Sequence, residues 1–154
     1  MGVSGDANGQ KIEVKSSRAY KKISLTEENA IEICTNCSTT VYNISEAENK
    51  SSKYDCNIQQ LKPDCFQFLY YGVFFYDKIE IFRADRSKIP ESTSSFKKNK
   101  AATTKNFPGY SVQHKGGDEC QFHITRKTHA HHRAKYFYQE MDYDELYDLL
   151  TSKK

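Results

Sequence analysis

The sequence predicts one α+β domain over residues 1–154, with a mixed central β-sheet flanked by helices. Three patterns support this prediction. Polar and apolar residues alternate at 11–15, which is the period of a half-buried strand. A nearly unbroken aromatic and aliphatic run at 66–76 is typical of a central strand. A capped amphipathic pattern at 142–150 indicates a helix.

The chain is expected to begin with a loop followed by a strand. Three glycines within the first ten residues predict a loop or a tight turn. In the strand at 11–15, Ile12 and Val14 are expected to face the core. Glu13 and Lys15, two residues apart, then share the opposite face.

Two further strand pairs are predicted. The run at 66–76 is expected to be covered on both faces, because almost no polar position interrupts it. A tight turn at Asp77-Lys78 returns the chain as a strand over 78–82. A Gly116-Gly117 turn separates the last two strands, 110–114 and 121–125.

The remaining segments are interpreted as one helix and two loops. Ser24-Leu-Thr-Glu27 resembles a capping box and predicts a helix over about 25–34. Residues 43–57, rich in Asn, Ser, Lys and Glu, are expected to form a surface loop. Residues 85–108 are rich in Ser, Thr and Lys and are expected to form a long loop that would order on a partner.

Composition places the chain among globular proteins. Its 154 residues suffice for a core, and 11 Tyr and 9 Phe supply large side chains to fill it. No apolar run reaches the ~18–20 residues that cross a bilayer, and the N-terminus lacks the apolar stretch of a secretory signal. Five cysteines in such a chain are expected to be free thiols or metal ligands rather than disulfides. The sequence therefore predicts a cytoplasmic protein, or one acting inside a host cell, that does not engage a membrane.

Charge is distributed unevenly over the C-terminal half. The whole chain carries only +3, but residues 97–135 hold nine Lys and Arg against two acidic residues, a local balance of +7. Five acidic residues follow within 140–148. A basic stretch beside an acidic one suits a surface that draws phosphate to one side, and it equally fits a solvated lysine-rich loop.

The pattern with the most specific chemistry lies near the N-terminus. Glu13 and Lys15 share one face of a predicted strand, and Asp6 stands just upstream across a short Asn-Gly turn that can fold it back beside Glu13. Two carboxylates and a lysine suit metal-assisted cleavage of a phosphodiester. Carboxylate oxygens hold Mg²⁺ while leaving positions for water and phosphate. The lysine orients the water or stabilises the pentacoordinate phosphate.

With this spacing, Asp6…Glu13-Val-Lys15 resembles the Asp…(Asp/Glu)-x-Lys signature of the PD-(D/E)XK nucleases. Segments at 59–63, 77–79 and 113–116 are in the style of type II restriction endonucleases. The resemblance implies a restriction-endonuclease-like core and a Mg²⁺-dependent, sequence-specific endonuclease acting on double-stranded DNA, with Mn²⁺ as a substitute. It implies Asp6, Glu13 and Lys15 as catalytic residues, and the Asp6 and Glu13 carboxylates with the Val14 carbonyl as metal ligands.

The chain departs from the family pattern at its start. Gly5 stands where the family usually has proline before the first aspartate, and only five residues precede Asp6. The family fold normally places a helix and a strand there. The chain is therefore expected to lack these N-terminal elements, or to obtain them from a missing N-terminal segment or from another chain, such as a second copy in a homodimer.

Seven polar residues near the predicted strand ends are expected to contact DNA. A Gln amide such as that of Gln113 pairs with adenine in the major groove, although the same segment also fits a polar hairpin tip. The predicted set is Ser16, Gln59, Gln60, Lys62, Gln113, His114 and Lys115.

Other interpretations remain open. One alternative is that the chain is a non-catalytic DNA-binding remnant of such an enzyme. Another is a zinc-stabilised interaction module built on Cys34-Thr-Asn-Cys37 with Cys120 and His123. Against zinc, Cys120 and His123 are three apart on a strand and should face opposite sides, which favours buried thiols. The histidines at 129, 131 and 132 lie among basic residues and are expected to contact phosphate or solvent. Pro63-Asp64 followed by Glu80 is a second acidic pair, but Phe82 stands where the lysine would be.

Overall fold

The computed structural model describes residues 3–7, 9–22, 27–28, 31, 41–43, 54–90, 100–112 and 119–152. Its strands are β1 (Val3–Ala7), β2 (Gln10–Arg18), β3 (Tyr20–Lys22), β4 (Val41–Asn43), β5 (Asp55–Leu61), β6 (Phe68–Phe74), β7 (Ile79–Asp85), β8 (Tyr110–Val112), β9 (Cys120–Thr125) and β10 (Phe137–Met141). Its helices are α3 (Lys100–Asn106), α4 (Arg126–Tyr136) and α5 (Tyr143–Thr151), with short 3-10 turns at Pro63–Cys65 and Arg86–Lys88.

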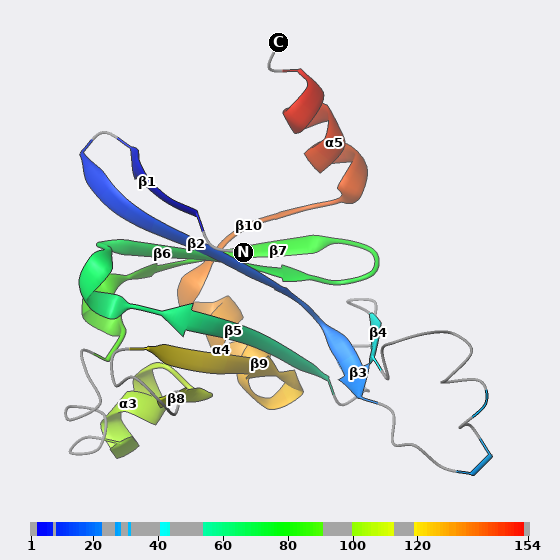
Figure 1. The fold of residues 1–154 in the computed structure, drawn as a ribbon, viewed down its shortest axis with the longest axis horizontal. Coiled ribbons are helices and arrows are strands. Elements are labelled where there is room, and N and C mark those ends of the chain that lie inside the picture. Colours follow the sequence, from blue (N-terminus) through cyan, green and yellow to red (C-terminus); the bar gives the residue numbers. More distant parts are fainter. Residues whose placement is uncertain are drawn as a thin grey trace.

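The described strands form two sheets, which we call sheet A and sheet B (Figure 1). Sheet A has the order β1-β2-β6-β7-β10, and sheet B has the order β4-β3-β5-β9-β8. In sheet A, β2 and β6 run parallel while the other pairs are antiparallel, so the predicted α+β class with a mixed sheet is confirmed. The chain passes from sheet A to sheet B at Ala19, whose amide donates to the Phe74 carbonyl at 2.8 Å.

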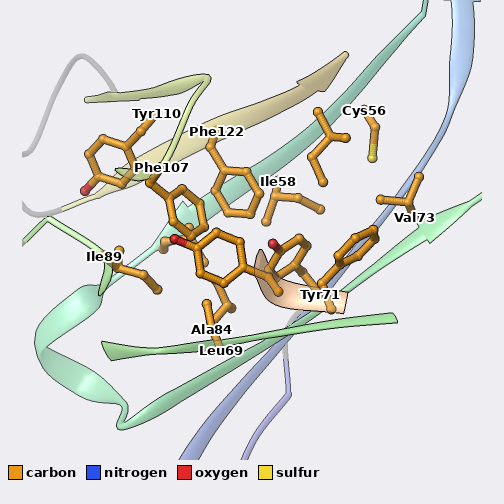
Figure 2. Close-up of a cluster of buried hydrophobic side chains, with 14 of the residues drawn as sticks. Cys56, Ile58, Leu69, Tyr71, Val73, Ala84, Ile89, Phe107, Tyr110 and Phe122 are labelled. Atoms are coloured by element: carbon orange, nitrogen blue, oxygen red, sulfur yellow. The ribbon is translucent and has the colours of Figure 1, made fainter. Parts of the chain in front are cut away.

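The core fills the space between the two sheets (Figure 2). We call the face of sheet A that is turned toward sheet B its inner face. Tyr71 of β6 lies at the centre of this core, stacked on Phe82 and edge-on to Phe122, each with a centroid distance of 5.0 Å. Aromatic contacts of this kind stabilise the fold beyond the stabilisation that comes from burying the rings. The prediction that the 66–76 run forms a central strand is therefore confirmed. The predicted cover on both faces is not found in the described part of the chain, because Phe68, Tyr70 and Phe74 on the other face are only partly buried.

Helix α4 packs against β7 and β9 and contributes histidines to the core. His132 is fully buried, with Nδ1 2.9 Å from the Tyr71 hydroxyl and Nε2 3.1 Å from the Pro108 carbonyl. Burial lowers the pKa of His132 to about 4, and it raises the pKa of Tyr71 well above its ordinary value. The expectation that His129 and His132 contact phosphate or solvent is therefore wrong. On a helix, positions 129, 132 and 136 share one face, and here that face is buried.

The C-terminal helix is confirmed. The Asp142 carboxylate accepts from the Glu145 amide at 2.7 Å, and the Glu145 carboxylate accepts from the Asp142 amide at 2.9 Å. This reciprocal pair is the capping box that starts α5. The strands predicted at 78–82 and 121–125 also form, as β7 and β9, and the described part of the strand predicted at 110–114 forms β8.

Several predicted boundaries are wrong. The first ten residues include strand β1, which pairs with β2, and residues 100–106 of the predicted loop form α3. The loop predicted over 43–57 ends earlier, because β5 begins at Asp55. Most of the helix predicted at 25–34, and the Gly116-Gly117 turn, lie outside the described residues. Within the described part of the chain, no helix is both long enough and apolar enough to cross a membrane.

Candidate active site

Glu13 and Lys15 lie on the inner face of sheet A. In the parallel register of β2 and β6, Glu13 is opposite Leu69 and Lys15 is opposite Tyr71, and both of these neighbours are fully buried. The Lys15 ammonium is 2.9 Å from a Glu13 carboxylate oxygen, and each side chain is only 14% exposed. The predicted common face of Glu13 and Lys15 is therefore present, and it is the face that packs toward sheet B.

The prediction that Val14 faces the core is wrong. Its side chain is 44% exposed on the opposite, outer face of sheet A. Alternation along a strand separates two faces but does not say which one is buried. Here the register with β6 shows which face of β2 is buried, because Glu13 and Lys15 lie beside fully buried residues of that strand.

Strand β1 brings Asp6 close to Glu13 in register. β1 and β2 form an antiparallel hairpin that turns at Gly9, whose φ of +75° favours glycine. Asp6 is paired with Lys11, and Glu13 with Ser4, so positions 6 and 13 are diagonal neighbours on one face of the hairpin. The side chain of Asp6 is outside the described residues, so the convergence of the two carboxylates stays a prediction.

The proposed third metal ligand is the Val14 carbonyl. Val14 is paired with Val3 on β1 and with Tyr70 on β6. The Val3–Val14 pair is the one between β1 and β2 that lies farthest from the hairpin turn. The Val14 carbonyl therefore points within the plane of the sheet. Among the side chains that the structure describes, a set that does not include Asp6, no three His, Cys, Asp or Glu residues lie close enough to hold a metal ion.

A charged pair at this position is unfavourable for folding alone. Removing two charges from water has a desolvation penalty that their attraction only partly offsets, and apolar residues of similar size are often as stable or more so. Leu69 and Tyr71 show that this face accepts large apolar side chains. Glu13 and Lys15 therefore form an ion pair at a position where packing alone does not favour one.

Residues predicted to contact DNA lie in different places. Gln59, Gln60 and Lys62 are exposed at the end of β5, and Gln60 has a positive φ of 56° at a break in the pairing with β9. Lys62 forms an ion pair with Glu119 at 3.7 Å. Ser16 is exposed, on the outer face and therefore on the side opposite Lys15. Gln113, His114 and Lys115 lie outside the described residues.

The competing acidic and zinc sites are not assembled in the described part of the chain. Asp64 is exposed and bonds Arg86 at 3.0 Å, whereas Glu80 is fully buried and 2.6 Å from His129. Cys120 is buried, while His123 lies on the other side of β9 and its Nδ1 is 2.8 Å from Asp55. The predicted opposition of Cys120 and His123 is thus confirmed, and buried Cys56 also fits the thiol interpretation, because burial raises its pKa to about 12. Cys34 and Cys37 lie outside the described residues.

A charge network centred on the buried Glu80 was not predicted from the sequence. The Glu80 carboxylate accepts from both His129 and Arg133, and Arg133 also bonds Glu140 at 3.0 Å. This network joins β7 to α4 and β10. One signal was available, since Glu80 interrupts an apolar strand and the histidine and arginine are four residues apart, on one face of a helix.

No family model, curated protein or solved structure matches the chain, so its function has to be argued from the geometry of the site itself.

Proposed function

We propose that the chain is a Mg²⁺-dependent endonuclease that hydrolyses phosphodiester bonds of double-stranded DNA. The observation that supports this best is the Glu13–Lys15 ion pair, which is largely buried on the inner face of sheet A. Position 6 of β1 is the diagonal neighbour of Glu13 on that face. The proposal includes a restriction-endonuclease-like core, with which an α+β domain and a mixed sheet are compatible.

The donor set fits a hard divalent cation. The Asp6 and Glu13 carboxylates, with the Val14 carbonyl, would hold Mg²⁺, which takes oxygen ligands and keeps several waters. When bound, the ion lowers the pKa of a coordinated water and neutralises charge on the phosphate. Mn²⁺ accepts the same oxygen ligands and is expected to substitute.

Lys15 supplies the positive charge of the site. Its ammonium is held at the Glu13 carboxylate, so it would lie where a water and a scissile phosphate meet. There it would orient the water and stabilise the charge that builds on the phosphoryl oxygens. The water oxygen forms a bond to phosphorus, the bridging P–O bond breaks, and the products are an alcohol and a phosphate monoester.

The DNA backbone would be held by exposed cations on α3 and α4. These helices are neighbours, because the Asn106 carbonyl at the end of α3 accepts from the Tyr136 hydroxyl at 2.7 Å. Their exposed lysines include Lys100, Lys105, Lys127 and Lys135. Recognition of a specific DNA sequence is assigned to Gln59 and Gln60 at the end of β5 and to residues 113–115.

Duplex binding is therefore expected to fall steeply with salt. Affinity of the wild-type chain for a short duplex, measured by fluorescence anisotropy from 50 to 300 mM KCl in Ca²⁺ buffer, should lose about 0.9 log units per log unit of salt for each phosphate contacted. Replacing Lys100, Lys105, Lys127 and Lys135 with glutamine should lower this slope by about two or more. Lys88→Gln, an exposed lysine outside both helices, is the control. Absence of saturable duplex binding would contradict the proposed substrate, and an unchanged slope would contradict the assignment of these lysines.

A further inference from the structure

The outer face of sheet A carries an apolar hollow of about 220 Å³. The hollow crosses from β2 over β6 and β7 to α5, and its lining includes Val14, Tyr70, Gly72, Phe74, Ile81 and Leu146. Gly72 lies in its floor, where a Cβ atom would come within 3.0 Å of the Phe74 ring. This surface is on the opposite side of the sheet from Glu13 and Lys15.

The strand pairing makes a bare outer face unusual. β2 and β6 run parallel, and parallel strands are normally covered on both faces. Sheet B and α4 cover the inner face. On the outer face, within the described part of the chain, only α5 reaches the hollow, where Leu146 forms one end.

Helix α5 continues the apolar surface beyond the hollow. Tyr143, Leu146, Tyr147 and Leu150 have the spacing of one helical stripe. No residue of α5 is buried, and Tyr147 and Leu150 are 66% and 70% exposed. Figure 1 shows α5 projecting away from both sheets. A nine-residue helix is marginal in water without packing, so this stripe is suited to a partner.

Exposed apolar side chains are concentrated in this region. Nine large hydrophobic residues of the described chain are exposed, and six of them lie in β10 and α5. One of the six, Phe137, faces α4 on the inner side, where Arg133 lies over its ring. The other five are Tyr138, Tyr143, Tyr147, Leu149 and Leu150. Tyr138 packs edge-on against Tyr70 of the outer face, with a centroid distance of 5.4 Å. Scattered apolar residues need no explanation, whereas a cluster of this kind marks an interaction site.

The charge beside the stripe indicates what kind of partner fits. α5 carries Asp144, Glu145 and Asp148, follows Asp142, and contains no Lys or Arg. Asp142 and Asp144 border the stripe, whereas Glu145 and Asp148 lie on the far side of the helix. Glu140, just before it, is already paired with Lys78 and Arg133. The opposite end of the face carries Arg83, which lies over the Phe68 ring at 4.2 Å. A partner segment is thus complementary if it is apolar on one side and basic where it runs along α5.

We propose that the hollow and the α5 stripe together bind an amphipathic helix of a partner protein, with Lys or Arg beside its apolar stripe. A second copy of this chain fits less well, because two α5 helices would bring their carboxylates together. In addition, none of the described helices combines an exposed apolar stripe with basic flanks. The proposal is independent of the nuclease site, which lies on the other face.

The test uses two synthetic 18-residue helical peptides with the same leucine stripe, one flanked by lysine and the other by glutamate. Fluorescence anisotropy with the wild-type chain at 100 mM salt should show saturable binding of the lysine peptide, at least about tenfold tighter than the glutamate peptide. Leu150→Ser and Tyr147→Ser should each weaken it about tenfold. Asp144→Asn, at a carboxylate that borders the stripe, should reduce the preference for lysine to about threefold or less.

Ile31→Ser is the matched control, because Ile31 is 79% exposed, does not belong to α5 and does not line the hollow. It should leave peptide binding unchanged. The proposal is overturned if the lysine peptide does not saturate, if both peptides bind equally, or if Ile31→Ser weakens binding as much as Leu150→Ser. It is also overturned if the chain self-associates in sedimentation and Leu150→Ser makes it monomeric, since the occupant is then a second copy.

Discussion

Lys15→Ala is expected to cleave DNA about 10²–10³ times more slowly than the wild-type chain while binding it almost as tightly. The lysine is held at Glu13, so its charge acts on the phosphate mainly as negative charge builds in the transition state. Single-turnover cleavage rates measure the first quantity, and anisotropy in Ca²⁺ buffer measures the second. A loss of affinity equal to the loss of rate would instead indicate a binding role.

Two controls separate chemistry from folding. Arg18→Ala removes a cation from the same strand on its outer face and should leave the rate unchanged. Lys15→Ala also leaves the largely buried Glu13 carboxylate without its partner, so the thermal unfolding of this variant has to be compared with that of the wild-type chain. A folded Lys15→Ala that cleaves at the wild-type rate would show that the active site has been placed wrongly.

Glu80→Ala is expected to lower the free energy of unfolding by about 3–5 kcal/mol, the largest loss of stability among the substitutions proposed for this chain. The Glu80 carboxylate is fully buried and accepts from His129 at 2.6 Å and from Arg133. Alanine leaves both donors without this acceptor and removes the Glu80 link between β7 and α4. Urea unfolding at pH 7 measures the difference.

The matched control for Glu80 is an exposed carboxylate. Glu119 is 36% exposed and its ion pair with Lys62 is 3.7 Å long, so Glu119→Ala should change the free energy of unfolding by less than about 1 kcal/mol. If Glu80→Ala lost no more than Glu119→Ala, the network would not hold α4 to sheet A.

Local signals account for the elements that were predicted correctly. The run at 66–76 and the turn at Asp77-Lys78 specify β6 and β7 through residues close in sequence. Asp142 and Glu145 specify the start of α5 in the same way, through reciprocal hydrogen bonds three residues apart. Such patterns need no knowledge of distant contacts.

Tertiary contacts decided the elements that were missed. His132 reads as a polar residue in a basic stretch, and its burial depends on Tyr71 and Pro108, both distant in the sequence. β1 contains Gly5 between the polar Ser4 and Asp6, and it is a strand because β2 offers it an edge. Propensity carries little information where pairing of this kind sets the structure.

The candidate site was only partly predictable, because it depends both on local spacing and on the register with a distant strand. A spacing of two residues put Glu13 and Lys15 on one face of a strand, which is a local property. Which face is buried was not predictable, because it depends on the register with Leu69 and Tyr71 of β6. The apolar Val14 pointed to the wrong answer, since it lines the apolar hollow of the outer face, on the same side of β2 as Ser16 and Arg18.

Cleavage of supercoiled plasmid by the wild-type chain and by Glu13→Gln, side by side in Mg²⁺, tests the central claim most directly. Glutamine keeps the size of Glu13 but removes the negative charge that a metal ion requires. We expect the wild-type chain to nick or linearise the plasmid with Mg²⁺ or Mn²⁺ and not with EDTA, and Glu13→Gln to be slower by about 100-fold or more. No cleavage by a wild-type chain that still binds duplex DNA would indicate a non-catalytic DNA-binding protein, and equal rates for the two chains would contradict the proposed site.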